Sequence, residues 1–146
     1  MLLINNDIIL NHERLVIFFN KENRMEITNK LLLILNVKIT TSTLEKDLYD
    51  HPDYSSLLSI SDVLIGYGVG NICIKSSVDK LSEMPVPFIV PVNSESSNNL
   101  FAVIESVNGN TIRYYDPEKH QWENISRDNF EKKCPSGIII EVCFKL

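Results

Sequence analysis

The sequence has few of the residues on which small metal-bound or disulfide-stabilised proteins depend. It contains three cysteines, Cys73, Cys134 and Cys143, with no C-x-x-C pair and no cysteine–histidine cluster. We therefore expect no metal site and no cofactor. The odd number of widely spaced thiols favours a reducing compartment. A chain of 146 residues buries roughly 70% of its unfolded surface, so it can form a core without such cross-links.

An excess of positive charge is also missing. Lys and Arg number 14 and Asp and Glu 19, which gives a formal net charge of −5. A surface that binds nucleic acid needs a basic stripe to neutralise phosphates. We therefore expect no nucleic-acid partner.

Long hydrophobic runs are absent as well, since no window approaches the roughly 20 apolar residues that span a bilayer. The apolar N-terminal stretch is interrupted at Asn5, Asn6 and Asp7, and it lacks the basic start of a signal peptide. We expect residues 1–146 to form one cytoplasmic domain, or a soluble domain of a membrane protein at the cytoplasmic face of the inner membrane. Any membrane contact would then come through regions outside this chain.

The first half of the chain has helical patterns. Within 25–37, apolar residues recur at helical spacing, and Asn36 is expected to end the helix. Thr43 before LEKDLYD predicts an N-cap and a second short helix. A third helix is predicted over SLLSISDVLIGYG, ending at Gly66 or Gly68.

The second half has strand patterns. LFAVIESV and TIRYYDP flank Asn108-Gly109, a strong hairpin signal. By the strand period of two, Phe101 and Val103 share one face, and Ala102 and Ile104 the other. NICIKSS, QWENIS and GIIIEVCFKL predict further strands and SRDNFEKKC a short helix, whereas the three prolines of PVPFIVPV argue against an interior strand. Together these patterns predict an α+β fold, with N-terminal helices packed on a C-terminal antiparallel sheet.

The order of these elements resembles the C39 peptidase domain, a papain-like cysteine protease fold. The matching segments are LLLILNVKIT, LEKDLYDHPDYSSLLSISDVLIGYGV, DKLSEMPVPFIVPV, FAVIESVNGNTIRYYDP and ISRDNFEKKCPSGIIIEV. The resemblance is strongest from residue 25 to residue 142. In that family the domain usually precedes the membrane segments of an exporter and cuts a peptide after a double-glycine leader.

Cysteine-protease chemistry needs a thiolate, an imidazole and a group that orients the imidazole. In the family the nucleophilic Cys opens the first helix, but here NKENRMEITNK offers only the hydroxyl of Thr28. Leu100 occupies the family's His position, Asp116 is the remaining triad member, and only Asn20 and Asn23 stand near the position of the oxyanion-hole Gln. Because loss of two members removes nearly all of a catalytic unit's contribution, the resemblance implies an inactive peptidase-like domain, a pseudoenzyme.

Such a domain would bind a peptide or protein segment in the former cleft, where an exposed sheet edge would supply main-chain hydrogen bonds, or it would dock onto the rest of a larger membrane transporter or thiol-oxidoreductase protein. We expect Leu100 to face the start of the first helix, near Asn23–Ile27. The candidate peptide-binding residues are Asn23, Ile27, Asn99, Leu100, Phe101 and Asp116.

Two alternatives stay open. One is an active cysteine peptidase that processes double-glycine leaders, with an unusual dyad such as Cys73 and His120. The other is a structural accessory module of a thiol oxidoreductase. DHPDYSSLLSISDVL is similar to degenerate C39-like domains of vitamin K epoxide reductase and thioredoxin-type membrane proteins, which implies attached transmembrane or thioredoxin-like domains.

Each candidate residue also has a structural interpretation. An Asp before Pro117 is typical of a turn, and His51 and His120 lie in loops that are expected to be solvated. Cys134 and Cys143 are expected to pack in the core, and Cys73 would be reactive only if its face of the strand is exposed. Three aromatic residues can either line a peptide groove or fill the core, namely Tyr114, Tyr115 and Trp122.

Overall fold

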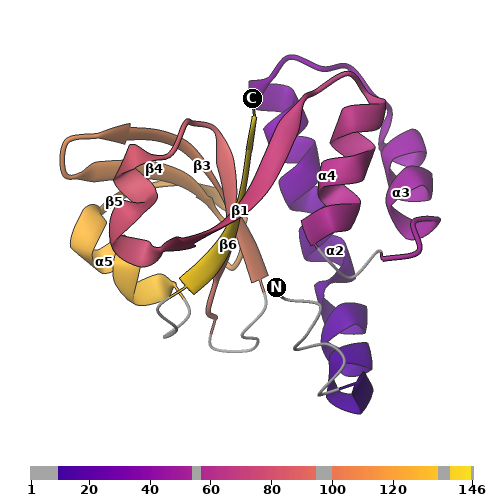
Figure 1. The fold of residues 1–146 in the computed structure, drawn as a ribbon, viewed down its shortest axis with the longest axis horizontal. Coiled ribbons are helices and arrows are strands. Elements are labelled where there is room, and N and C mark those ends of the chain that lie inside the picture. Colours follow the sequence, from indigo (N-terminus) through magenta and orange to yellow (C-terminus); the bar gives the residue numbers. More distant parts are fainter. Residues whose placement is uncertain (1–9, 54–56, 95–99, 135–138, 146) are drawn as a thin grey trace.

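The computed structural model describes residues 10–53, 57–94, 100–134 and 139–145, and side-chain surroundings within 22–134 of these. Figure 1 shows the N-terminal helices gathered beside a sheet, with a 3-10 helix and a short α-helix at its opposite end. The helices are α2 (Leu10–Ile34), α3 (Thr41–Tyr49), α4 (Leu57–Gly66), η1 (Val78–Glu83) and α5 (Arg127–Lys133). The strands are β1 (Asn71–Ser77), β2 (Phe88–Val92), β3 (Leu100–Asn108), β4 (Thr111–Asp116), β5 (Gln121–Ser126) and β6 (Ile139–Lys145). This arrangement confirms the predicted α+β class.

Helix α2 ends where the sequence predicts but begins 15 residues before Met25, at Leu10. Asn36 adopts the left-handed conformation with φ 57°. The Val37 amide then donates to the Leu32 carbonyl at 2.9 Å, and the Asn36 amide to the Leu33 carbonyl. These two bonds form a Schellman motif with Asn36 at the position after the C-cap.

The starts and ends of α3 and α4 follow the same capping rules. Thr40, not Thr43 as predicted, is the N-cap of α3: its backbone is extended and its hydroxyl accepts from the Thr43 amide at 3.2 Å. Helix α4 ends at Gly66, and the chain turns away at Gly68, where φ is 82° and the Val69 amide donates to the Leu64 carbonyl. Of the two predicted stop positions for α4, Gly68 is the one that makes the left-handed turn.

The six strands form one sheet in the order β1-β6-β2-β3-β4-β5, and every pair is antiparallel. Strand β2 is interior, so the prediction drawn from its prolines was wrong. Pro85 and Pro87 precede the strand, and β6 pairs with Phe88 and Ile89 only. Pro91 lies beyond that contact, so its missing N–H interrupts no described pairing with β6.

The β3–β4 hairpin turns one residue later than predicted. Asn108 pairs with Thr111, which leaves Gly109 and Asn110 as the two-residue loop. Gly109 has φ 59°, and Asn110 is not among the residues with positive φ. A positive φ at the first central residue alone is typical of a type II′ turn, which favours Gly there.

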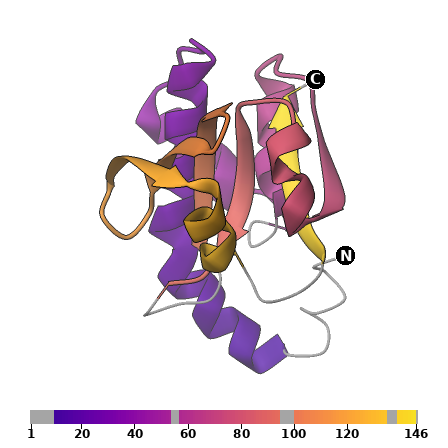
Figure 2. The same cartoon turned by 90° about the vertical axis from the view of Figure 1, so that its left-hand side faces the viewer.

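The core has two halves, one on each face of the sheet. The first cluster packs the helices against one face and includes Ile27, Leu64, Phe101 and Val103. The second packs η1 and α5 against the other and includes Phe130, Ala102 and Ile104. The predicted alternation of residues 101–104 is therefore confirmed. In the turned view of Figure 2, α2 runs alongside the strands.

Candidate functional site

Helix α2 meets the start of β3 through Asn23. Its Nδ2 donates to the Phe101 carbonyl at 3.1 Å, and the Phe101 amide donates to Asn23 Oδ1 at 2.8 Å. Asn23 is 7% exposed and Phe101 6%. The carboxamide therefore pairs with β3 as a neighbouring strand would. We call this pair of hydrogen bonds the Asn23–Phe101 latch.

The latch lies where the predicted cleft would bring a nucleophile and a base together. The side chain that α2 presents there is an amide, which is neither. The hydroxyl of Thr28, one turn further along, is fully buried and donates to the Arg24 carbonyl at 2.7 Å. The sheet edge that the sequence analysis offered to a peptide at Phe101 is thus already hydrogen-bonded.

Leu100 does not face α2, so the expectation that it would do so was wrong. Its half-buried side chain packs against the second cluster, on the α5 side of the sheet. The physical reason is the strand period: Phe101 faces the helices, so its neighbour must face the other way. Ile27 is fully buried in the first cluster. Asn99 lies outside the described residues.

Asp116 is buried, with 4% exposure, and its carboxylate is fully engaged in local bonds. Oδ2 accepts from the Tyr114 hydroxyl at 3.1 Å, and Oδ1 accepts from the amides of Glu118 and Lys119 at 2.8 and 3.2 Å. This is the turn role that Asp before Pro commonly has. No imidazole is among these partners.

A second contact ties α2 to the sheet through Glu26. Its carboxylate accepts from the Tyr115 hydroxyl and pairs with His120 Nδ1 at 2.9 Å. His120 has φ 53°, and its amide donates to the Asp116 carbonyl at 2.9 Å. The imidazole therefore pairs with Glu26 on α2 and does not simply point to solvent as expected, although the side chain is 67% exposed.

His51 is also held in place, contrary to the expectation of a solvated loop residue. Its side chain is 15% exposed. Nδ1 accepts from the Asp53 amide at 2.9 Å, and Nε2 lies 2.8 Å from Asp62 Oδ2. Because Nδ1 accepts, the ring proton lies on Nε2 and points at Asp62, so this histidine joins the end of α3 to α4.

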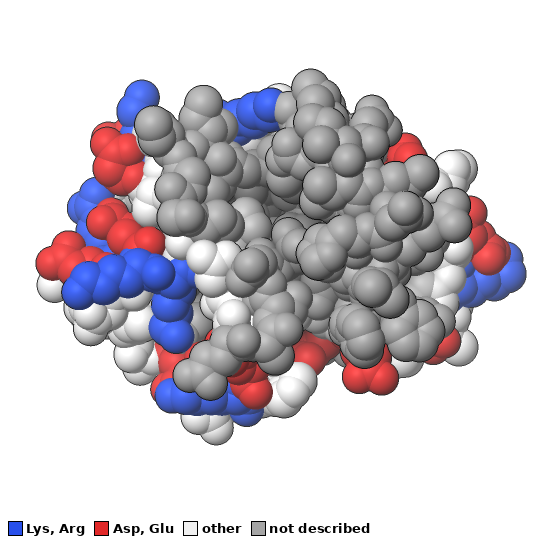
Figure 3. All heavy atoms as spheres, turned by 90° about the horizontal axis from the view of Figure 1, so that it is seen from below, with Lys and Arg blue, Asp and Glu red and all other residues white. Residues whose placement is uncertain are grey.

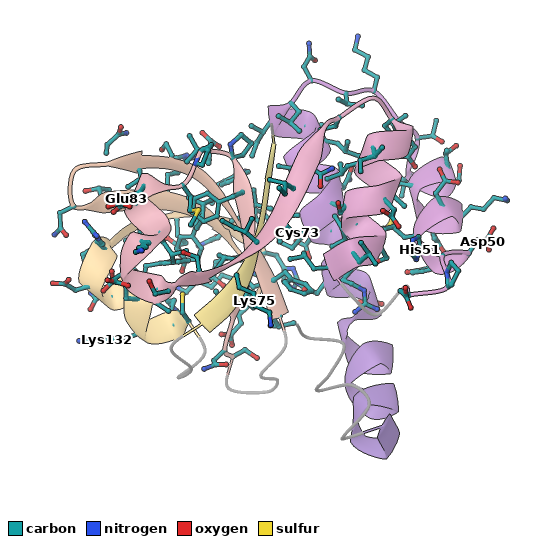
Figure 4. All side chains as sticks on the ribbon, viewed as in Figure 1. Asp50, His51, Cys73, Lys75, Glu83 and Lys132 are labelled. Carbon is teal, nitrogen blue, oxygen red and sulfur yellow. The ribbon has the colours of Figure 1, made fainter. Side chains whose placement is uncertain are left out.

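The fold does not bring Cys73 and His120 together. Cys73 lies on the edge strand β1, and its half-buried side chain packs against the first cluster (Figure 4). His120 is in the turn between β4 and β5, and β6, β2 and β3 separate β1 from β4. Cys143 lies opposite Cys73 in the β1–β6 register, but its side chain is outside the described surroundings.

Cys134 follows α5 and is buried in the second cluster. Burial, reinforced by the nearby Glu131 carboxylate, raises the pKa of this thiol to about 12. The thiolate is the nucleophilic form of cysteine. Cys134 is therefore a packed core residue with no capacity for nucleophilic attack near neutral pH, as predicted.

The aromatic residues fill the core. Tyr115 and Trp122 form an edge-to-face pair with ring centroids 5.3 Å apart. Tyr114 and Phe130 form a similar pair at 5.3 Å on the other face. Burial is the main cause that raises the pKa of both tyrosines, with Asp116 acting on Tyr114 and Glu26 on Tyr115. The structural interpretation holds for these two tyrosines.

Two open grooves lie beside these contacts, and the sequence analysis identified neither. The first, about 570 Å³, lies between α2 and α3. The second, about 500 Å³, borders Asp116 and the end of α5. Across the described residues, no three His, Cys, Asp or Glu side chains are grouped closely enough to hold a metal ion. On the face seen in Figure 3, acidic and basic side chains alternate along the margin.

The sequence model of the peptidase C39 family matches residues 28–143. The chain belongs to the peptidase C39 family. Among curated proteins, no sequence matches it. Within the described part of the chain, no helix is long and apolar enough to cross a bilayer.

Solved structures of C39 peptidase domains share the fold. A double-glycine-motif protease from an AMS/PCAT transporter, crystallised with the leader peptide, superposes with TM-score 0.65 at 18% identity, over 82% of this chain and 79% of that one. The peptidase domain of Streptococcus ComA, a bi-functional ABC transporter of a quorum-sensing pathway, gives 0.64 at 15% identity, over 82% and 86%. The resemblance to vitamin K epoxide reductase-type proteins finds no support in these comparisons.

Proposed function

We propose that this C39 family domain recognises a peptide or protein segment and does not cut it. The observation that supports the proposal is the Asn23–Phe101 latch, which fills the crossing of α2 and β3 with a carboxamide and a backbone amide. Acyl transfer needs a nucleophile next to a base. Where α2 meets β3, the Asn23 carboxamide, which is neither a nucleophile nor a base, faces the Phe101 backbone. The carboxylate of Asp116 already accepts hydrogen bonds from a tyrosine hydroxyl and two backbone amides.

The peptide partner is proposed from the fold relationship. A structurally similar domain was crystallised with a leader peptide, and a fold that loses its catalytic groups can keep its binding surface. Leu100 packs on the other face of the sheet, so Asn23 and Phe101 are the candidate contacts in the former cleft. Main-chain pairing at Phe101 would require a peptide to displace Asn23.

We also propose that the domain works as a soluble, cytoplasmic part of a larger membrane transporter, because the structurally similar domains belong to such transporters. Membrane contact would come through regions outside this chain. An attached thiol oxidoreductase stays a weaker prediction, since the comparisons add nothing to it.

Incubation with synthetic double-glycine peptides, followed by mass spectrometry, tests the absence of cleavage. We expect intact peptide with the natural protein and also with Leu100→His, because a histidine alone has no thiol to activate. Turnover that disappears in Cys73→Ala would contradict the proposal. Titration of the same peptides into the domain, while its backbone amide chemical shifts are followed by NMR, tests binding. We expect shift changes that saturate with peptide concentration.

A further inference from the structure

The groove between α2 and α3 is formed by side chains at helical spacing on two facing helices. From α2 come Glu22, Met25, Glu26 and Asn29, and from α3 come Thr41, Glu45 and Tyr49. Residues three and four apart share one face of a helix. One face of α2 and one face of α3 therefore form the two walls of the groove. Along the chain, Glu22 and Glu26 are next to Asn23 and Ile27 of the former cleft.

The lining has charge of one sign. It contains three carboxylates and no Lys or Arg. Glu26 is bonded to Tyr115 and His120, whereas Glu22 and Glu45 have no ion-pair partner among the residues that the structure describes. Arg24 is 5% exposed and does not line the groove, although its charge acts on Tyr49 from behind the lining.

The carboxylates act on one point of the groove, the Tyr49 hydroxyl. Burial raises the pKa of this tyrosine, and Glu45 and Glu22 raise it further, while Arg24 opposes them. Glu22 on α2 and Glu45 on α3 line opposite walls of the groove. A cation between them would be attracted from both sides.

We propose that the α2–α3 groove binds a peptide segment that presents a lysine or arginine side chain next to an apolar one. The cationic head would pair with Glu22 and Glu45, while the aliphatic stem would pack on Met25 and the Tyr49 ring. The inference rests on the proposed function, because it names the side-chain chemistry that the domain selects.

Fluorescence anisotropy on residues 1–146 tests the selection with three labelled peptides, GLKLRLG, GLQLQLG and GLELELG. We expect the basic peptide to bind at least fivefold more tightly than the neutral one, and the acidic one not to bind. Each exposed carboxylate removed should weaken binding of the basic peptide about two- to fivefold. Glu22→Gln with Glu45→Gln should therefore weaken it about four- to twenty-fivefold without changing the neutral peptide's affinity.

Glu83→Gln is the matched control, because Glu83 is an exposed glutamate of η1 on the far side of the sheet from α3 (Figure 4). It should leave the affinity unchanged. Equal binding of basic and neutral peptides, or a double variant that behaves like Glu83→Gln, would overturn the inference.

No binding of the basic peptide would also overturn the inference. A double-glycine peptide run in parallel separates the two conclusions. If it still binds uncut, the proposed function stands and only the charge selection fails. If it does not bind, the proposed function fails as well.

Discussion

Replacement of Asn23 by alanine should destabilise the domain far more than a typical substitution on a helix surface. The change removes both hydrogen bonds of the Asn23–Phe101 latch and leaves a buried N–H and a buried C=O on Phe101. Each unsatisfied buried group costs about 1–3 kcal/mol. The higher helix propensity of alanine offsets about 0.6 kcal/mol of that cost. For the two groups together we expect a net loss of about 1.5–5.5 kcal/mol in the free energy of unfolding.

Urea denaturation measures this loss. With a slope of about 2 kcal/mol per M, the midpoint should fall by about 0.7–2.7 M. Asn29→Ala is the matched control, since Asn29 lies on the same helix and makes no hydrogen bond to another described residue. It should stay within about 0.5 kcal/mol of the natural protein. An Asn23→Ala midpoint as high as that of Asn29→Ala would refute the latch as a tertiary constraint.

Three further predictions follow from single residues. Ellman's reagent should not modify Cys134 in the folded protein near neutral pH, because burial raises its thiol pKa to about 12; reaction at the rate of a free thiol would contradict its burial. Gly109→Ala should cost about 1–2 kcal/mol in urea unfolding, since φ is 59° there, whereas Gly66→Ala in α4 should cost nothing. Because the pKa of Tyr114 is raised in the folded protein, the contribution of this group to the free energy of unfolding is fully present below the unfolded pKa near 10. It decreases as the pH rises above that value, by at most about 1.4 kcal/mol per pH unit. Tyr114→Phe should reduce that slope.

Local residue patterns were enough to predict the elements and the class of the fold. The apolar spacing of 25–37, the stop at Asn36 and the alternation of residues 101–104 each depend on neighbours within about one helical turn or strand repeat. Errors of one to three residues, as at Thr40 and Gly109, arose where adjacent residues compete for the same cap or turn. The interior position of β2 was missed because it depends on which strands flank it, and on where β6 stops pairing.

The sequence alone also predicted that neither a Cys nor a His stands at the positions that the resemblance assigns to the catalytic pair. The tertiary contacts made near those positions could not be predicted in this way. Asn23 and Phe101 are 78 residues apart, and Glu26 and His120 are 94 apart. No local pattern joins such pairs, because they meet only when the helices pack on one face of the sheet.

The sequence by itself determined which residues alternate along β3, and so that Leu100 and Phe101 face opposite ways. Only the tertiary structure decided which of the two faces α2. That choice depends on packing the whole first cluster against the sheet, in which Ile27, Leu64 and Val103 are buried together. The burial of this apolar surface fixes the side on which the helices lie, and with it the Asn23–Phe101 latch and the groove between α2 and α3.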